Sequence, residues 1–382
     1  MNCWIRLSLA TGTLNSLRNA LEKMRSIEAL LALANLVTFL HLTVLLPRNI
    51  AWMRYSALIA LLIAIAQVLL EGARWQIIPA YVLTGVFLLV WRLKSIPLAA
   101  QTTGQAKGCA LFSKSAACVG ILGLALAIAL PIVLPVFHLE RPSGPYQIGT
   151  LTYHWVDQNR AELFSAEANV RRELMVQIWY PAQPDPSSPR TLYVHDSEAL
   201  SQAFAQLRHW PRFALTHLRY VTSHAVHGAA ISNGKPNYPV LIFMEGLTGF
   251  RQMNTFQVEE LVSHGYVVAA IDQPYVAATV VLPDGRRVDG LSKDRLDELI
   301  QQSVKPARTA PRLNGRPLGD GIIAYLAQDA AFTLDRMTSL NQADPNGVLT
   351  GRLDITHAGI FGISLGGIAV SEACRTDLRF RA

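Results

Sequence analysis

The hydrophobic pattern divides this chain into two parts. Four long apolar runs follow one another in the first 140 residues, with no polar face between them. A helix that spans a bilayer needs about 20 mostly apolar residues, so the runs predict transmembrane helices rather than buried helices of a soluble bundle. The predicted spans are Ala29–Leu46, Tyr55–Leu70, Trp75–Trp91 and Ser115–Phe137.

After the last apolar run the composition shifts. Pro142, Gly144, Pro145 and Gly149 mark a linker, because proline and glycine interrupt regular structure. The predicted domains are therefore an amino-terminal segment over residues 1–27, about four transmembrane helices over 28–138, a linker over 139–150 and an α/β domain over 151–382.

Short strands and helices alternate in the second part, which favours a mainly parallel sheet. Period-two alternation or short apolar runs predict strands at Glu173–Tyr180, Pro239–Phe243, Tyr266–Ile271 and Thr356–Phe361. Apolar positions at helical spacing predict helices at Gln257–Ser263 and Asp320–Leu340. The turn Pro283-Asp284-Gly285 predicts a hairpin between Ala277–Leu282 and Arg286–Val288.

Residues 191–230 are aromatic and basic, and we interpret them as a helical insertion over the sheet that serves as a lid or acyl-chain surface. The histidines of interest in the segment are His209, His217, His224 and His227. They lack a zinc-binding spacing such as H-E-x-x-H, so we interpret them as solvated helix residues and expect no metal site.

The charge pattern fits a membrane protein better than a nucleic-acid-binding one. The net charge of +7 comes from cations that flank apolar runs rather than from one basic block. Arg92, Lys94, Lys107 and Lys114 lie between the third and fourth predicted spans, and by the positive-inside rule this loop is cytoplasmic. That orientation predicts an extracytoplasmic domain after Phe137. The cations of the weakly amphipathic residues 1–23 favour the opposite orientation.

The four cysteines do not form a pattern with chemical meaning. They are Cys3, Cys109, Cys118 and Cys374, and three of them lie in or beside the apolar region. Their spacing predicts neither a disulfide framework nor a metal centre.

The strongest chemical motif is Gly362-Ile363-Ser364-Leu365-Gly366. It follows the predicted strand Thr356–Phe361 and opens an apolar-periodic stretch. A serine flanked by glycines between a strand and a helix is the setting of the nucleophile elbow of α/β-hydrolases. Gly362 and Gly366 allow the tight turn, and Ser364 is the candidate nucleophile. A glycine-rich turn without catalytic meaning is the alternative interpretation.

A second motif follows an earlier strand. The segment Met244–Gly249 comes directly after Pro239–Phe243 and is glycine-rich. In this fold the oxyanion hole uses the amide after the nucleophile and an amide from such a loop, so Leu365 and Leu247 are the candidate donors.

Together these motifs resemble the platelet-activating factor acetylhydrolase family of α/β-hydrolases. The matching segments are Gly144–Tyr146 with Gly149-Thr150, Arg172–Pro181, Glu245–Arg251, Ser263–Asp272, Phe332–Arg336, the elbow, and Asp377–Phe380. The resemblance spans about residues 142–382, with the motifs in the expected order.

The resemblance implies hydrolysis of carboxylic esters with short acyl chains on a phospholipid or similar amphiphile, without a metal or organic cofactor. The partners would be the lipid bilayer and the substrate, not nucleic acid. The family commonly has histidine where this chain has Glu245. This departure changes the electrostatics expected of the oxyanion loop.

The resemblance also implies that part of the catalytic machinery is missing. The acid and the histidine of the triad come after the serine in this fold, and this sequence ends 18 residues after Ser364. We therefore expect an incomplete α/β-hydrolase fold with no triad acid or histidine in the chain. His264, Asp272 and Asp354 are present, but a substitute triad needs a specific geometry around the serine.

Three functional hypotheses remain open. The first is a membrane-anchored serine esterase that is inactive as truncated, for which we expect little or no turnover of p-nitrophenyl acetate. The second is a non-catalytic binding or sensing module derived from a hydrolase. The third is an acyltransferase of the same fold. The elbow serine favours the first, because a binding module has no need of a strained nucleophile.

Overall fold

The computed structural model describes residues 24–43, 51–95, 106–167, 169–304, 312–318 and 320–380. The predicted amphipathic character of residues 1–23 lies outside this part of the chain. Contacts divide the chain into two compact units, Met1–Phe137 and His138–Ala382.

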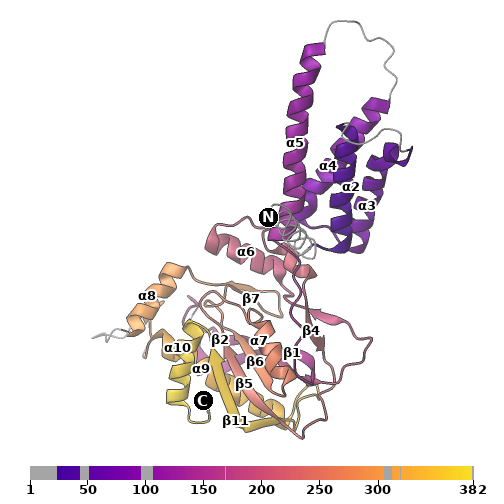
Figure 1. The fold of residues 1–382 in the computed structure, drawn as a ribbon. Coiled ribbons are helices and arrows are strands. Elements are labelled where there is room, and N and C mark those ends of the chain that lie inside the picture. Colours follow the sequence, from indigo (N-terminus) through magenta and orange to yellow (C-terminus); the bar gives the residue numbers. More distant parts are fainter. Residues whose placement is uncertain are drawn as a thin grey trace, which may run out of the picture. The chain divides into compact units, whose positions relative to one another are not determined.

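The first unit consists of helices that pack side by side (Figure 1). They are α2 (Ser26–Leu42), the 3₁₀ turn η1 (Ala51–Tyr55), α3 (Ser56–Leu70), the 3₁₀ turn η2 (Trp75–Ile77), α4 (Ile78–Ser95) and α5 (Ala106–Val133). Among the residues that the structure describes, three segments are long and apolar enough to cross a membrane, namely Met53–Leu70, Trp75–Leu93 and Ser115–Val133.

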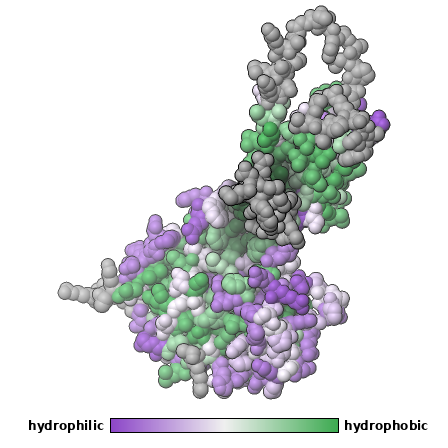
Figure 2. Space-filling view, viewed as in Figure 1, coloured by the Kyte–Doolittle hydropathy of each residue, from purple (hydrophilic) through white to green (hydrophobic). Residues whose placement is uncertain are grey.

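The first predicted span differs from the other three. Helix α2 has 17 residues and ends at Leu42, so it is shorter than the other candidates. The end of that predicted span, residues 44–46, lies outside the described residues. Large apolar side chains cover the outside of these helices, as the hydrophobic colour in Figure 2 shows, with Leu69 77% and Leu70 76% exposed.

Polar side chains also bind the helices of this unit to one another. Asn35 of α2 donates to the carbonyl of Ala80 in α4 at 3.1 Å, and Thr84 Oγ1 lies 3.0 Å from Asn35 Oδ1. Glu28 forms a buried ion pair with Arg74 at 2.6 Å. Interhelical hydrogen bonds of this kind fix helix pairs where apolar packing alone is permissive.

The second unit is built around one mixed sheet. In the described residues its strand order is β11-β5-β6-β2-β1-β4-β3. These strands are β1 (Gln147–Ala161), β2 (Arg171–Ala182), β3 (Arg190–Leu192), β4 (Thr222–His227), β5 (Tyr238–Met244), β6 (Val267–Asp272) and β11 (Leu353–Gly362). Strands β11, β5 and β6 run parallel, and β2 runs antiparallel to β6.

Helices cover both faces of the sheet. Helix α7 (Thr255–Ser263) packs on one face, and α9 (Gly321–Gln342) and α10 (Leu365–Thr376) pack on the other. Helix α8 (Lys293–Val304) packs against α9, and α6 (Ser197–Arg208) packs against η3 (Thr216–Tyr220). Alternate residues of β5 face opposite ways. Ile242 packs in one core with residues of α9 and α10, whereas Phe243 packs in another with Val258 of α7. This alternation is the period-two pattern of a strand that is buried on both faces.

Most of the predicted elements are confirmed. Strands β2, β5, β6 and β11 and helices α7 and α9 coincide with their predicted segments within a few residues. The predicted hairpin is β7 (Thr279–Val281) paired with β8 (Arg287–Asp289). A second small hairpin pairs β9 (Arg312–Leu313) with β10 (Arg316–Pro317).

The interpretation of residues 191–230 as a helical insertion is wrong at both ends. The segment begins inside β3 and includes β4, which pairs with β1 and β3. The signal for β4 was a short alternation, in which Ser223 and Ala225 are buried while Thr222 is exposed. His224 lies on this strand and His217 is 4% exposed, so neither is a solvated helix residue.

Candidate active site

Ser364 occupies the turn between β11 and α10 in a strained backbone conformation. Its φ is 53° and its ψ is −119°, a combination that residues other than glycine rarely adopt. Strand β11 ends at Gly362 and α10 begins at Leu365, so the serine stands at the tip of the turn and is exposed. This is the geometry in which a nucleophile elbow presents its hydroxyl.

The flanking glycines are required by close packing. A Cβ atom on Gly366 would lie 2.2 Å from the carbonyl oxygen of Met244 and 2.4 Å from that of Glu245. A Cβ atom on Gly362 would lie 2.7 Å from the carbonyl carbon of Gly366. Helix α10 therefore approaches the end of β5 more closely than any side chain allows.

The same packing brings the loop after β5 to the serine. A Cβ atom on Gly246 would lie 3.2 Å from the Cβ atom of Ser364. The two predicted motifs are more than 100 residues apart in sequence, and the parallel pairing of β5 with β11 makes them neighbours.

Both candidate oxyanion donors keep a free amide in the described part of the chain. In the β5 loop, Thr248 donates to the carbonyl of Val276 at 2.9 Å and Gly249 donates to that of Gly246 at 3.0 Å. The amide of Leu247, the residue before Thr248, has no acceptor in the described residues. Leu365 is the first residue of α10, where amides have no intrahelical partner. The geometry is compatible with oxyanion binding.

A buried carboxyl pair lies next to this loop. Glu245 is 1% exposed and Asp272, the last residue of β6, is 2% exposed. Arg251 binds Asp272 through its guanidinium and its backbone amide. The only hydrogen bond that Glu245 accepts in the described residues is a long one, 3.5 Å, from the amide of Gln273, and its Oε2 atom has none.

The surroundings of Glu245 set its protonation state. Burial, and after it the negative charge of Asp272, raise the pKa of Glu245 well above its ordinary value of 4.5. Since Asp272 has the arginine as its partner, the proton of the pair resides on Glu245. The sequence indicated a change of electrostatics at this position, but the pairing of Asp272 with Arg251 depends on the tertiary structure.

The possible substitutes for a triad base and acid lie elsewhere or are occupied. His264 is at the end of α7, half exposed, beside Glu260 and Ser143. Asp354 binds His357 near the start of β11, at the opposite end from Ser364. Among the described residues, no imidazole or carboxylate forms a hydrogen bond with the Ser364 hydroxyl.

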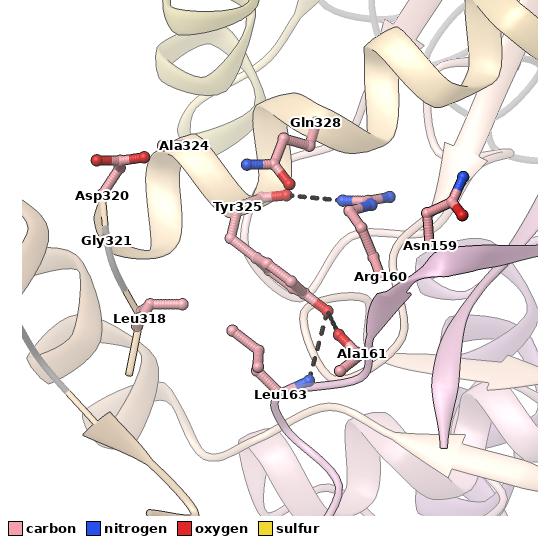
Figure 3. Close-up of a pocket in the computed structure, with 10 residues that line it drawn as sticks. All are labelled: Asn159, Arg160, Ala161, Leu163, Leu318, Asp320, Gly321, Ala324, Tyr325 and Gln328. Atoms are coloured by element: carbon pink, nitrogen blue, oxygen red, sulfur yellow. Dashed lines mark hydrogen bonds between the residues drawn. The ribbon is translucent and has the colours of Figure 1, made fainter. Parts of the chain in front are cut away.

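A cavity of about 300 Å³ lies between the end of β1 and the start of α9 (Figure 3). Arg160 points into this region, but its charge is neutralised by ion pairs with Asp157 at 2.6 Å and Asp329 at 2.7 Å. Burial would raise the pKa of Asp329, but Arg172 and Arg160 outweigh it, and the pKa lies below its ordinary value. The charged side chain in the cavity wall is therefore part of a structural network of ion pairs. Ser364 is not among the residues that line this cavity.

The strand–turn–helix with its strained serine and the adjacent glycine-rich loop define the class of the second unit. It has the sheet, the strand-to-helix turn and the exposed serine that are typical of α/β-hydrolases. Residues 133–284 match the family described as platelet-activating factor acetylhydrolase, isoform II. Over these residues the chain is similar to the platelet-activating factor acetylhydrolases. The matched residues include the β5 loop, and Ser364 lies beyond them.

Curated relatives agree with this relationship. The chain is 23% identical over 249 residues to platelet-activating factor acetylhydrolase of Cavia porcellus, an alignment that covers 64% of this chain and 53% of the relative. It is 26% identical over 224 residues to that of Bos taurus, covering 54% and 48%. The chain therefore spans about half the length of the curated relatives it matches.

Among solved structures, the chain is similar to a ferulic acid esterase from Streptomyces cinnamoneus. The two are 30% identical with a TM-score of 0.48, and the match covers 64% of this chain and 59% of the esterase.

Proposed function

We propose that this chain acts on carboxylic esters through an acyl-enzyme on Ser364. The observation that carries the proposal is the backbone of Ser364, a strained non-glycine residue at an exposed strand-to-helix turn, beside a loop with a free amide. Strain of this kind is found where the surrounding structure enforces it, above all at functional sites.

In the proposed reaction the hydroxyl of Ser364 attacks the ester carbonyl. The amides of Leu247 and Leu365 stabilise the negative charge on the carbonyl oxygen. The alcohol leaves, and water then releases the acyl group as a carboxylic acid. By similarity to the curated relatives, we propose short-acyl esters or phospholipid-like amphiphiles as substrates.

We also propose that turnover by this 382-residue chain is slow. A serine hydroxyl needs a general base to become a nucleophile, and no described imidazole forms a hydrogen bond with Ser364. Loss of triad members lowers kcat by about 10⁴ to 10⁶ in serine hydrolases, while the oxyanion hole retains residual catalysis.

The test is chemical rescue. p-Nitrophenyl acetate hydrolysis by the purified full chain is measured with and without imidazole in solution, and the Ser364→Ala variant corrects for direct reaction of imidazole. We expect a low rate without imidazole, and an imidazole-dependent increase that Ser364→Ala lacks. Equal rates for the two proteins with imidazole would refute the proposal and favour a non-catalytic binding module.

We further propose that the first unit anchors the hydrolase unit in a membrane. Three apolar segments of 18 or 19 residues have the required length and composition. By the positive-inside rule, the cations Arg92 and Lys94 at the end of α4 favour a cytoplasmic α4–α5 connection, and with it a hydrolase unit outside the cytoplasm.

A further inference from the structure

A second cavity in the hydrolase unit has a volume of about 440 Å³. Its walls are residues 141–148 before and at the start of β1, the β2–β3 loop over residues 184–190, and His224 and Val226 of β4. The volume lies in the range of small-molecule sites, which is about 300 to 1,000 Å³.

This cavity lies at the opposite edge of the sheet from the proposed active site. Strand β2 is antiparallel to β6, and its Met175 pairs with Asp272, the last residue of β6. Ala182, seven residues further along β2, pairs with Gln147 at the cavity. Strands β11, β5 and β6 are parallel, so Ser364, which follows the carboxyl end of β11, lies at the same end of the sheet as Asp272. Seven residues of strand β2 cover about 23 Å, and the cavity therefore lies at the other end.

The cavity presents uncompensated positive charge. Arg141 and Arg190 both line it and are exposed, and within the described residues neither forms an ion pair. Asp185 also lines the cavity and carries a negative charge, which the amide and the hydroxyl of Ser187 stabilise through hydrogen bonds, so the two arginines exceed the acidic lining by one charge. This contrasts with the cavity of Figure 3, where two carboxylates neutralise the arginine.

A histidine with a fixed orientation lies between these charges and the core. The backbone amide of His224 donates to Oε1 of Glu259 at 2.8 Å, and its Nδ1 lies 2.7 Å from Oε2. The side chain of Glu259 is fully buried, whereas that of His224 is 15% exposed. Holding Nδ1–H on a carboxylate fixes the ring and leaves Nε2, which is without a partner in the described residues, for a ligand.

We propose that this cavity binds a phosphate ester. Arg141 and Arg190 supply the positive charge that phosphate recognition requires, and Nε2 of His224 is the ring nitrogen that remains available to contact the ligand. Ile148 and Val226 offer an apolar surface to the rest of the ligand. The phosphate ester is either a lipid headgroup or a small soluble compound, and the two sources share the same chemistry at the site.

The test uses the full chain in a neutral detergent. Inorganic phosphate, an ether-linked dihexyl phosphatidic acid and the matching ether-linked dihexylglycerol, neither of which has a carboxylic ester, are each titrated by calorimetry. The variant Arg141→Gln/Arg190→Gln removes the charge at exposed positions, so it should fold. Arg208→Gln/Arg212→Gln is the matched control, because it removes the same charge from exposed positions outside the cavity.

We expect phosphate or the ether-linked phosphatidic acid to bind and the ether-linked dihexylglycerol not to bind. The cavity variant should bind at least about tenfold more weakly, while the control variant should match the parent. If inorganic phosphate binds, a small soluble phosphate compound is enough to occupy the cavity. If only phosphatidic acid binds, the ligand is a lipid headgroup. Absence of binding by both, or an equal loss in the control variant, overturns the proposal. Esterase activity enters none of these measurements.

Discussion

At the residue scale, the fold determines the backbone conformation of Ser364 and the charge state of Glu245. Ser364 is held in a strained conformation by the contact of α10 with the end of β5. Glu245 keeps a proton because it is buried beside Asp272. Both features require tertiary structure, since the sequence alone shows only a serine between glycines and a glutamate after a strand.

The buried carboxyl of Glu245 predicts a loss of stability with rising pH. The pKa of Glu245 is higher in the folded chain than its ordinary value of 4.5, so the protonated side chain contributes fully to the stability of the fold below pH 4.5. This stabilisation is lost as the pH rises toward the pKa of Glu245 in the folded chain. Glu245→Gln has no proton to lose. The free energy of unfolding of this variant should therefore fall less between about pH 5 and about pH 8, by on the order of 1 kcal/mol.

Asp272→Asn provides the contrast to Glu245→Gln. It leaves the buried guanidinium of Arg251 without its counter-charge, so it should destabilise the chain by about 3 to 5 kcal/mol at both pH values. Thermal unfolding monitored by circular dichroism distinguishes the two variants. If Glu245→Gln followed the same pH dependence as the parent, the protonated state assigned to Glu245 would be wrong.

At the element scale, the contact of α10 with β5 is the device that joins the serine to its neighbouring loop. The parallel register places Gly362 opposite Met244, and the missing side chain of Gly366 lets the helix begin at that point. The position of α10 is thus set by Gly362, Gly366 and the register of β11 against β5.

This packing predicts different effects for two neighbouring glycines. Gly366→Ala puts a methyl group 2.2 Å from a backbone oxygen that cannot move away, so it should cost at least about 1 to 3 kcal/mol and abolish imidazole-dependent hydrolysis. At Gly367 the nearest atom would lie 3.4 Å away, an ordinary contact.

Gly367→Ala is therefore the matched control. It should be tolerated, or should stabilise α10 by about 0.5 to 1 kcal/mol through helix propensity. Urea unfolding of both variants tests the pair. An equal loss in the two would mean that the close approach of α10 to β5 does not exist.

The sequence predicted the elements of the hydrolase unit better than its irregular parts. Strands β5 and β6 have short apolar runs, and β2 is buried at nearly every position, so the positions of these strands follow directly from burial. Strand β4 was missed because six residues among aromatic and basic neighbours give a weak alternation. The ion pair of His224 with Glu259 was missed with it, because pairing across 35 residues depends on the fold.

Of the candidate site, the sequence predicted the turn at Ser364 and the loop after β5. It did not predict that Gly246 lies against the serine, because that proximity comes from strand order and register. The roles of Ser364, Leu247 and Leu365 remain proposals, supported by this geometry.

At the scale of the whole molecule, two units of different surface chemistry share one chain. The first exposes large apolar side chains along its helices, whereas the second carries most of the ion pairs. Exposed apolar area of this extent is favourable in lipid and unfavourable in water.

The proposed topology can be measured with reporter fusions. Alkaline phosphatase joined after Phe137 should be active, because the enzyme folds outside the cytoplasm, and green fluorescent protein at the same position should be dark. A fusion in the α4–α5 connection should give the reverse pattern. The same pattern at both positions would contradict a span by α5.

The central claim is that Ser364 is a nucleophile placed beside an oxyanion loop. The most direct measurement is labelling of the full chain with a fluorophosphonate, with and without imidazole, followed by mass spectrometry of the labelled peptide. The account predicts slow labelling without imidazole and faster labelling with it, confined to Ser364. Absence of label at Ser364 under both conditions would contradict the claim, and stoichiometric label without imidazole would contradict the proposed slow turnover.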